Sequence, residues 1–337
     1  MDTTRQQMMQ KLQGAAALNV AFVGVSNGLF DVLSGLRSAT AAELAAKAGR
    51  DLGYVTRWCD AAYAFEYLER EQDRFHLTAT GEAFRPDAPD TLMPMAVQAV
   101  LGAHMAERAA GLMRTGERPG EKVLAERETI LPWFGPMLEH SFATMFAQQI
   151  VPAIPAFARV DERGGLAVDL GCGNGWYLRA LAKRCGHLRG IGLDGFEENI
   201  RQATELAAQA GLQDHLEFRA GDLHHFTVDG PVDLIAMNRA LHHVWDEKEN
   251  VFRILAEHLA PGGSAVIWEP RWPDDPAALR HPRGRGMAFQ NLSEHVQGNH
   301  FLRPDEIAAE LEKAGLRSEV HLFGEGYEAV VVGTKPE

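Results

Sequence analysis

The sequence predicts a doubly wound α/β domain over residues 156–337, preceded by an all-α and winged-helix N-terminal region. The first observation is an alternation of apolar, strand-like runs with segments of helical periodicity, which is typical of a parallel sheet. The second is a cluster of three glycines between the first run and the helix that follows it. Seven strands are expected, at residues 166–170, 188–194, 216–222, 232–238, 263–269, 318–324 and 328–334.

The composition limits the possible partners and compartments. A length of 337 residues allows two domains, and a formal net charge of -13 opposes binding to nucleic acid or to anionic lipid. The apolar run at residues 14–25 is too short to span a bilayer and lacks the cleavage site of a signal peptide. Three cysteines with no CxxC pair are typical of a reducing compartment. We therefore expect a cytoplasmic protein that binds neither membranes nor nucleic acid.

Residues 1–90 are expected to form the first domain. Thr40 is predicted to cap a helix that ends at Gly49, with Glu43 as its partner in a capping box. A second helix is predicted over residues 51–71 and a short hairpin, or wing, over residues 73–85. This order is typical of a winged helix.

A winged helix raises the question of DNA binding. Within residues 51–65, Arg57 is the one basic residue, beside Asp51 and Asp60. A surface that contacts phosphates needs several Lys or Arg side chains on one face. We therefore expect the domain to serve dimerisation or to act as a lid, with a DNA-binding regulator as the alternative. Residues 91–155 are expected to be a helical connector and a lid over a substrate pocket, and residues 156–337 the catalytic domain.

The glycine cluster lies in "VDLGCGNGWYLRAL", directly after the first strand. Glycine lets the backbone turn tightly and approach a ligand closely. The spacing is GxGxG, and Trp176 stands where a dinucleotide-binding loop has its third glycine, which argues against NAD or FAD. Asp194 ends the second strand, where a carboxylate can bind ribose hydroxyls. Asp222 ends the third strand, and the alternative for either acid alone is a solvated strand end.

Together these motifs, with "LAPGG" at residues 259–263, resemble those of the class I S-adenosylmethionine-dependent methyltransferases, over residues 160–337. The resemblance implies a Rossmann-like methyltransferase domain. The N-terminal region resembles the dimerisation domain of small-molecule O-methyltransferases, which implies a homodimer and a small-molecule acceptor. The cofactor-binding residues implied are Asp169, Gly171, Gly173 and Gly175 at the methionine end, Asp194 at the ribose, and Asp222 with Leu223 at the adenine, with Asn238 at the end of the fourth strand beside them.

Two adjacent histidines follow the fourth strand in "NRALHHVWDEKEN". Ligands of open α/β sheets bind beyond the carboxyl ends of the strands, so His242 and His243 are expected at the mouth of the site. "LHHVWDE" is similar to the "LHDWxDE" motif of O-methyltransferases, in which the first histidine removes the proton of the acceptor. That resemblance assigns the base to His242 and its orientation to Glu269, and His243 replaces the aspartate of the motif. The alternative is two capping histidines and a solvated glutamate.

A further histidine suggests a metal. "NLSEHVQGNHFLRP" holds His295 and His300, and the sequence resembles C-methyltransferases of 2-oxo acids in having His242, His243, Glu269 and His295. The resemblance implies zinc or iron on His242, Glu269 and His295. A divalent ion would stabilise the enolate that forms when a weakly acidic C–H bond beside a ketone is broken. Three hypotheses remain open: metal-assisted C-methylation of a 2-oxo acid, metal-free O- or N-methylation with His242 as base, and a regulator that senses the cofactor.

Overall fold

The computed structural model describes residues 3–120, 122–127 and 129–337. The chain divides into two compact units, Met1–Glu107 with Leu124–His140, and Arg108–Val123 with Ser141–Glu337. We describe each unit by itself. The boundaries predicted near residues 90 and 155 stay a prediction.

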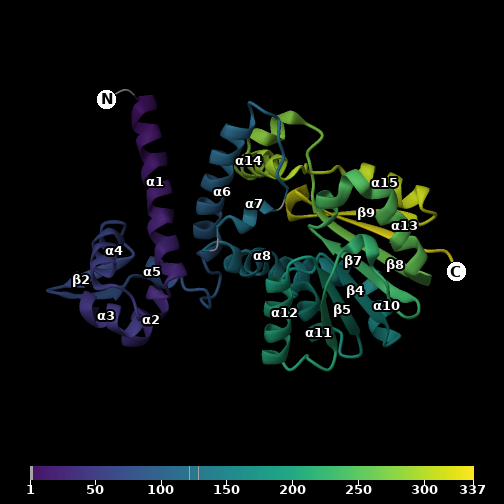
Figure 1. Ribbon diagram of the computed structural model, residues 1–337, viewed down its shortest axis with the longest axis horizontal. Helices are drawn as coiled ribbons and strands as arrows, with labels where there is room; N and C mark the ends of the chain where they lie inside the picture. Colours follow the sequence, from purple (N-terminus) through teal and green to yellow (C-terminus); the bar gives the residue numbers. More distant parts are fainter. Residues whose placement is uncertain (1–2, 121, 128) are drawn as a thin grey trace. The chain divides into compact units, whose positions relative to one another are not determined.

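The first unit is mainly helical and carries one small antiparallel sheet of strand order β1-β3-β2 (Figure 1). Its buried core gathers apolar side chains from most of its helices, Phe30 and Trp58 among them. The elements are α1 (Thr3–Ser26), α2 (Leu29–Leu36), β1 (Ala39–Thr40), α3 (Ala41–Ala48), α4 (Leu52–Ala64), β2 (Leu68–Glu71), β3 (Arg74–Leu77) and α5 (Ala79–Glu82). Three further helices each divide their residues between the two units: α6 (Met93–Leu112), α7 (Lys122–Ala125) and α8 (Leu131–Met145), of which Ser141–Met145 belong to the second unit.

Local sequence signals explain the helix ends of this unit. The predicted capping box of α3 is present, since the Thr40 side chain accepts a hydrogen bond from the Glu43 backbone and Glu43 returns one to Thr40. Gly49 ends α3 in the left-handed conformation, as predicted.

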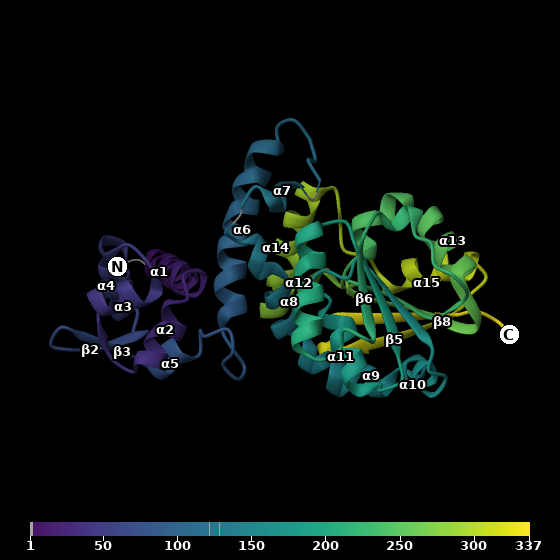
Figure 2. The same cartoon turned by 60° about the horizontal axis from the view of Figure 1, so that its bottom comes forward.

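The predicted extent of the next helix and of the hairpin was wrong. The helix α4 ends at Ala64, and Glu66, whose φ is 61°, starts the turn into β2. The strand β2 therefore uses residues that we had expected to be helical, and the hairpin β2–β3 begins earlier than predicted. The residues that follow β3 form the short helix α5 instead of a strand. Figure 2 shows the hairpin projecting from the helices of this unit.

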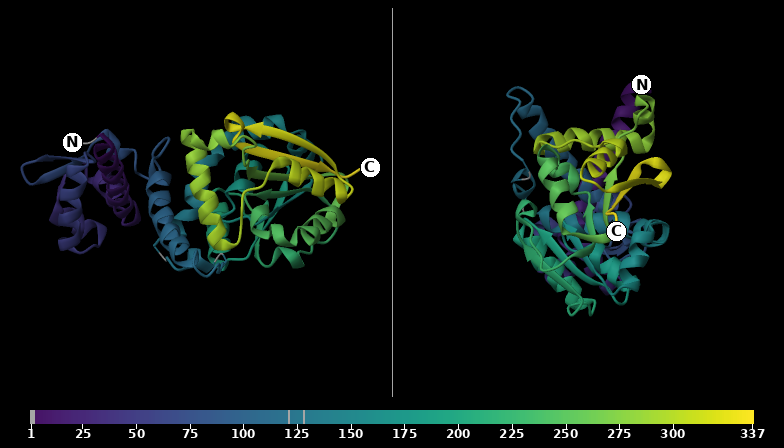
Figure 3. Two further views of the ribbon diagram at one scale, coloured as in Figure 1. Left: turned by 90° about the horizontal axis from the view of Figure 1, so that it is seen from above. Right: turned by 90° about the vertical axis from the view of Figure 1, so that its right-hand side faces the viewer.

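The second unit contains a seven-stranded sheet, as predicted, of order β6-β5-β4-β7-β8-β10-β9. The strands β4 to β8 of this sheet are parallel to one another, and β10 pairs antiparallel with both β8 and β9. In Figure 3 the two C-terminal strands, coloured yellow, complete one side of the sheet. The strands are β4 (Leu166–Leu170), β5 (Arg189–Asp194), β6 (Leu216–Ala220), β7 (Val232–Asn238), β8 (Leu259–Pro270), β9 (Arg317–Phe323) and β10 (Glu328–Thr334).

Helices cover both faces of this sheet, which is the doubly wound arrangement. Alternate residues of β7 point to opposite faces, so Leu234 belongs to one buried core and Ile235 to the other. The helices α10 (Pro155–Glu162), α11 (Trp176–Arg184) and α12 (Glu197–Gln209) pack on the first face, and α13 (Lys248–His258) and α15 (Pro304–Lys313) on the second. The unit also includes α9 (Val151–Ala153) and α14 (Pro282–Gln297). The predicted α/β architecture is confirmed.

The structure bears on two expectations, that no segment spans a membrane and that the cysteines are reduced. In the described part of the chain, no single helix has the length and apolar character needed to cross a membrane, although the bent pair of α1 and α2 passes the same test by length and composition. The three cysteines, Cys59, Cys172 and Cys185, are buried free thiols. The cytoplasmic location stays a prediction.

Candidate active site

The glycine loop connects β4 to α11 and depends on its three glycines. Gly171, Gly173 and Gly175 have φ angles of 79°, 53° and 73°, a region that side chains disfavour. A Cβ on Gly171 would lie 2.6 Å from the Cβ of Ala240, and a Cβ on Gly175 would lie 2.5 Å from the Phe218 ring. In the part of the chain that the structure describes, and apart from its two chain neighbours, no atom lies within 4 Å of a Cβ placed on Gly173. The outer two glycines therefore allow close packing, and Gly173 leaves the loop open to a ligand.

Two buried acceptor oxygens lie beside this loop. Asp169 is 1% exposed, and its Oδ1 has no hydrogen-bond partner within the described residues. The Oδ1 of Asn238, at the end of the neighbouring strand β7, also has none there. Burial, with a further contribution from the charge of Asp194, raises the pKa of Asp169 to about 8. A ligand that brings N–H donors or positive charge would satisfy both oxygens, which fits the ammonium and sulfonium groups of S-adenosylmethionine.

Asp194 ends β5 and holds the glycine loop. Its Oδ2 accepts a hydrogen bond from the backbone of Gly173 at 2.8 Å, and its Oδ1 accepts from Phe196 and from the Asn199 side chain, each at 2.9 Å. A carboxylate has about four lone-pair sites, so capacity remains for a hydroxyl group. The ribose role of Asp194 stays a prediction, and sequence reasoning missed Asn199.

Asp222 caps the short 3-10 helix η2 (Leu223–His225) that follows β6. It accepts hydrogen bonds from the His224 backbone at 2.9 Å and from the His225 ring at 3.0 Å. The first of these contacts, helped by the two histidines, lowers the pKa of the Asp222 carboxyl. Leu223 packs against the core of the sheet. The adenine role of Asp222 and Leu223 stays a prediction.

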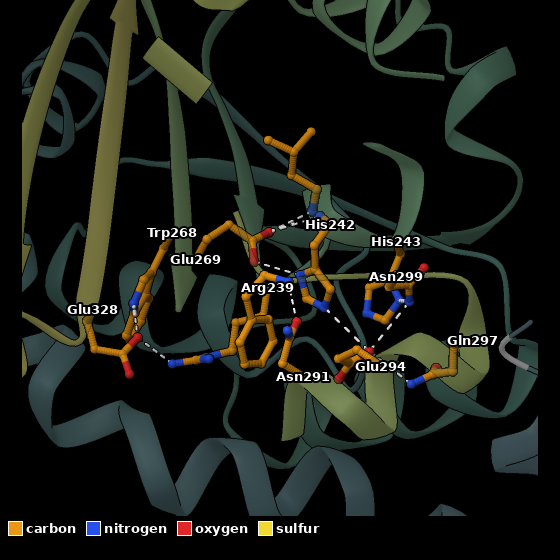
Figure 4. A network of polar contacts seen from close by, with 12 residues as sticks. Arg239, His242, His243, Trp268, Glu269, Asn291, Glu294, Gln297, Asn299 and Glu328 are labelled. Atoms are coloured by element: carbon orange, nitrogen blue, oxygen red, sulfur yellow. Dashed lines mark hydrogen bonds and ion pairs between the residues drawn. The ribbon is translucent and has the colours of Figure 1, made fainter. Parts of the chain in front are cut away.

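His242 and Glu269 form a buried pair at the carboxyl ends of β7 and β8 (Figure 4). The Nδ1 of His242 lies 2.6 Å from the Glu269 Oε2, and the Oε1 accepts the backbone N–H of Leu241 at 2.8 Å and of His242 at 3.3 Å. Burial by itself raises the pKa of Glu269, but the charges of His242, His243 and Arg239 and the bond to His242 hold it below its ordinary value. Because Glu269 is ionised, Nδ1 donates to it, and Nε2 is directed the other way.

Nε2 of His242 is directed at a second carboxylate. The Oε2 of Glu294, on α14, lies 3.8 Å from it. The His243 ring lies 4.1 Å from the His242 ring, centroid to centroid, and its Nδ1 is 2.7 Å from the Asn299 side-chain nitrogen. Among the residues that the structure describes, His242, His243 and Glu294 are the group that could hold a metal ion, with one ligand atom from each within 4.8 Å of the others.

The predicted metal ligands are arranged differently from expectation. Glu269 contacts the Nδ1 side of the His242 ring through Oε2, and its Oε1 accepts the backbone N–H of Leu241. These contacts support its predicted orienting role. His295 is exposed on α14, and its neighbour Glu294 is the residue that contacts His242. The metal role of His295 and of Glu269 stays a prediction, and Glu294 is a candidate that sequence reasoning missed. A single acid within one amphipathic helix gives no signal that would have distinguished it.

Comparison with known proteins finds similarity to several methyltransferases. Residues 167–263 match the model of a methyltransferase domain. The chain is 25% identical over 330 residues to the 3-amino-4-hydroxybenzoate 4-O-methyltransferase of Streptomyces cremeus, which covers 94% of this chain and 86% of that protein. It is 34% identical over 134 residues to the trans-aconitate 2-methyltransferase of Azoarcus sp. (strain BH72), which covers 40% of this chain and 48% of that protein.

The fold is shared along the whole chain. The structure of an O-methyltransferase family protein from Burkholderia thailandensis superposes with a TM-score of 0.75 at 20% identity, covering 100% of this chain and 98% of that one. Several curated relatives, the Azoarcus protein among them, match over less than half of their own length. The chain therefore carries a methyltransferase domain over residues 167–263 and shares, along its length, the fold of solved O-methyltransferase structures.

Proposed function

We propose that this protein transfers the methyl group of S-adenosylmethionine to a small molecule, with His242 as the base that takes the proton of the acceptor. The observation that carries the proposal is the buried contact of 2.6 Å between His242 Nδ1 and Glu269. A histidine held by a carboxylate has a fixed tautomer and a fixed direction, which proton abstraction requires. The Streptomyces cremeus relative, named as an O-methyltransferase of an aromatic acid, supports this class of reaction.

The residues of the β4–α11 loop would hold the cofactor. When bound, S-adenosylmethionine supplies an electrophilic methyl group. The unpaired oxygens of Asp169 and Asn238 would accept hydrogen bonds from its amino-acid portion, and Asp194 would accept from its ribose. Asp222 and Leu223 would flank the adenine. Contact of Ala240, two residues before His242, with Gly171 supports a location of the His242 ring near this loop.

A panel of small acceptors tests this proposal. The purified protein would be incubated with S-adenosylmethionine and with phenols, amines or 2-oxo acids, and products that gain one methyl group would be found by mass spectrometry. His242→Gln should lower turnover by about 10²–10⁴-fold and leave cofactor binding unchanged. His187→Gln, at an exposed histidine, is the matched control and should be fully active. Near-normal turnover in His242→Gln would overturn the role of the base.

Metal-assisted C-methylation of a 2-oxo acid is the second candidate, and the cluster of His242, His243 and Glu294 favours it. Two histidines and one carboxylate are a common ligand set for zinc or iron. A metal-binding histidine usually donates its other ring N–H to a carboxylate, as His242 can to Glu269. A divalent ion there would supply Lewis-acid stabilisation of a chelated 2-oxo acid. The residues present therefore fit a metal.

Metal content separates the two candidates. Elemental analysis should find about one zinc or iron per chain if the cluster is a metal site, and chelation should abolish methyl transfer until metal is restored. Glu294→Gln should be metal-poor if the cluster holds the ion. His295→Ala should be metal-poor if His295 is a ligand, and fully loaded if it is not. Full activity of a chelated, metal-free preparation would leave metal-free O- or N-methylation as the function.

We also propose a homodimer that binds no nucleic acid or membrane. Exposed apolar side chains of α1, among them Met8, Met9 and Leu12, support dimerisation. Light scattering during size-exclusion chromatography tests the dimer. A gel shift with genomic fragments at low salt tests the alternative of a regulator, because even non-specific binding would appear there.

A further inference from the structure

Arg239 occupies an unusual position between β7 and the base histidine. It follows the last residue of β7, three positions before His242, and its φ of 55° lies in the left-handed region that favours glycine. A non-glycine residue in this conformation is strained and persists only where its surroundings fix it. The side chain of Arg239 is therefore expected to be held by specific contacts.

Those contacts are present and buried (Figure 4). The guanidinium of Arg239 pairs with Glu328, the first residue of β10, and both side chains are more than nine-tenths buried. The Trp268 indole N–H donates to the same Glu328 oxygen at 2.9 Å. The Arg239 guanidinium also stacks on the Phe142 ring, 3.7 Å from its centroid, and the Arg239 backbone N–H donates to the Trp268 carbonyl at 2.8 Å.

The turn that Arg239 forms connects the cofactor loop to the base. Its next residue, Ala240, fills the space that the missing Cβ of Gly171 leaves open. The two residues after that, Leu241 and His242, direct their backbone N–H groups at Glu269. A change in the backbone at Arg239 would therefore move the His242 ring relative to both Glu269 and the glycine loop.

Stability alone is a poor explanation for this buried ion pair. Removing two charges from water is unfavourable, and an apolar pair of similar size often stabilises a protein as well or better. A guanidinium with a fixed planar geometry, held by a carboxylate, an indole and an aromatic ring, fixes direction instead. The place where it fixes direction is the start of the segment that carries His242.

We infer that Arg239 and Glu328 are a positioning pair, which holds the turn after β7 so that the His242 ring meets Glu269 and faces the acceptor. The inference rests on the proposed function for its consequence in turnover. The geometric part is independent of that function, since it concerns the resting hydrogen bond between His242 and Glu269. Arg239 touches neither cofactor nor acceptor in this scheme.

Two variants test the pair, each with a different change. Arg239→Lys keeps the positive charge but loses the planar guanidinium group and its stacking on Phe142. Glu328→Gln keeps the shape of the side chain but loses its negative charge. Leu311→Ala is the control, because Leu311 is fully buried at the opposite end of β10, against Gly333, and its loss destabilises the domain away from the site. His242→Gln assigns the downfield proton resonance of the His242 Nδ1–H in NMR spectra.

The expected result has two parts. In Arg239→Lys and Glu328→Gln the His242 Nδ1–H resonance shifts or broadens, and kcat falls by about 10–100-fold, as misplacement of a catalytic group by about 1 Å produces. Binding of S-adenosylmethionine is retained. In Leu311→Ala the melting temperature falls, but the resonance and kcat stay as in the wild type.

Other results would overturn the inference. An unchanged resonance in both variants removes the positioning role, whatever the activity. Equal changes in Leu311→Ala, or loss of folding in both variants, would assign the pair to stability alone. If the resonance shifts in the variants but the wild type transfers no methyl group to any acceptor, the positioning pair stands and the proposed function fails.

Discussion

Asp169 and Asp194 end adjacent parallel strands, β4 and β5, and the charge of Asp194 adds to burial in raising the pKa of Asp169 to about 8. Two carboxylates thus flank one glycine loop, but only one of them is hydrogen-bonded within the described residues at both oxygens. The Oδ1 of Asp169, which has no partner within the described residues, is the oxygen that a cationic ligand would stabilise in its ionised form.

Cofactor affinity should therefore depend on pH. Below pH 8 the free protein holds Asp169 protonated, and binding of positive charge requires that proton to leave. We expect the affinity for S-adenosylmethionine to rise with pH up to about 8 and then to level off. Calorimetry across this pH range measures the trend, and Asp169→Asn should bind more weakly and without the trend. A pH-independent wild type would contradict the assignment.

The same group affects stability with the opposite sign. The unfolded chain releases the Asp169 proton near pH 3.8, whereas the folded chain keeps it until about pH 8. Between these values the folded state binds more protons, so the free energy of unfolding should fall as pH rises. Urea unfolding at several pH values, compared between wild type and Asp169→Asn, isolates this contribution. An equal slope in both proteins would show that Asp169 ionises normally.

Glu269→Gln should impair turnover more than folding. The amide cannot provide the negative charge that holds the His242 N–H, so turnover should fall by about 10²–10⁴-fold, the range of general acid–base catalysis. Because the pKa of Glu269 is lowered in the folded protein, its stabilising contribution is present above pH 4.5 and is lost as pH falls below that value. Steady-state kinetics and acid unfolding check the two effects. A fully active Glu269→Gln would remove Glu269 from the mechanism.

Gly171→Ala and Gly173→Ala form a matched pair within one loop. Both residues have positive φ, so both substitutions strain the backbone, but only at Gly171 does the added methyl meet the Ala240 Cβ, at 2.6 Å. We expect Gly171→Ala to be less stable than Gly173→Ala by about 1–3 kcal/mol, the cost of overpacking. Denaturant unfolding of both variants measures the difference. Equal stabilities would mean that the turn after β7 moves freely.

The sequence predicted the parts of this protein that depend on periodicity and on strand ends. Apolar runs located the seven strands, and glycines and acids at their carboxyl ends located the cofactor loop, because parallel strands bring these ends together. It also placed Glu269 beside His242, since both lie at the carboxyl ends of neighbouring strands. Glu294 was not predictable, because α14 is distant in sequence and its packing depends on tertiary structure. The contact of Arg239 with Glu328 was not predictable either, because the two residues are 89 positions apart in the sequence.

Titration calorimetry of S-adenosylmethionine into the wild type and Asp194→Ala tests the central claim most directly. The wild type should bind one molecule per chain, and the variant should bind more weakly by about 1.5–3 kcal/mol for each charge-assisted hydrogen bond lost, a factor of ten or more. NAD should not bind. Equal affinity of the two proteins would contradict the place given to the ribose, and tight binding of NAD would contradict the assignment of the cofactor.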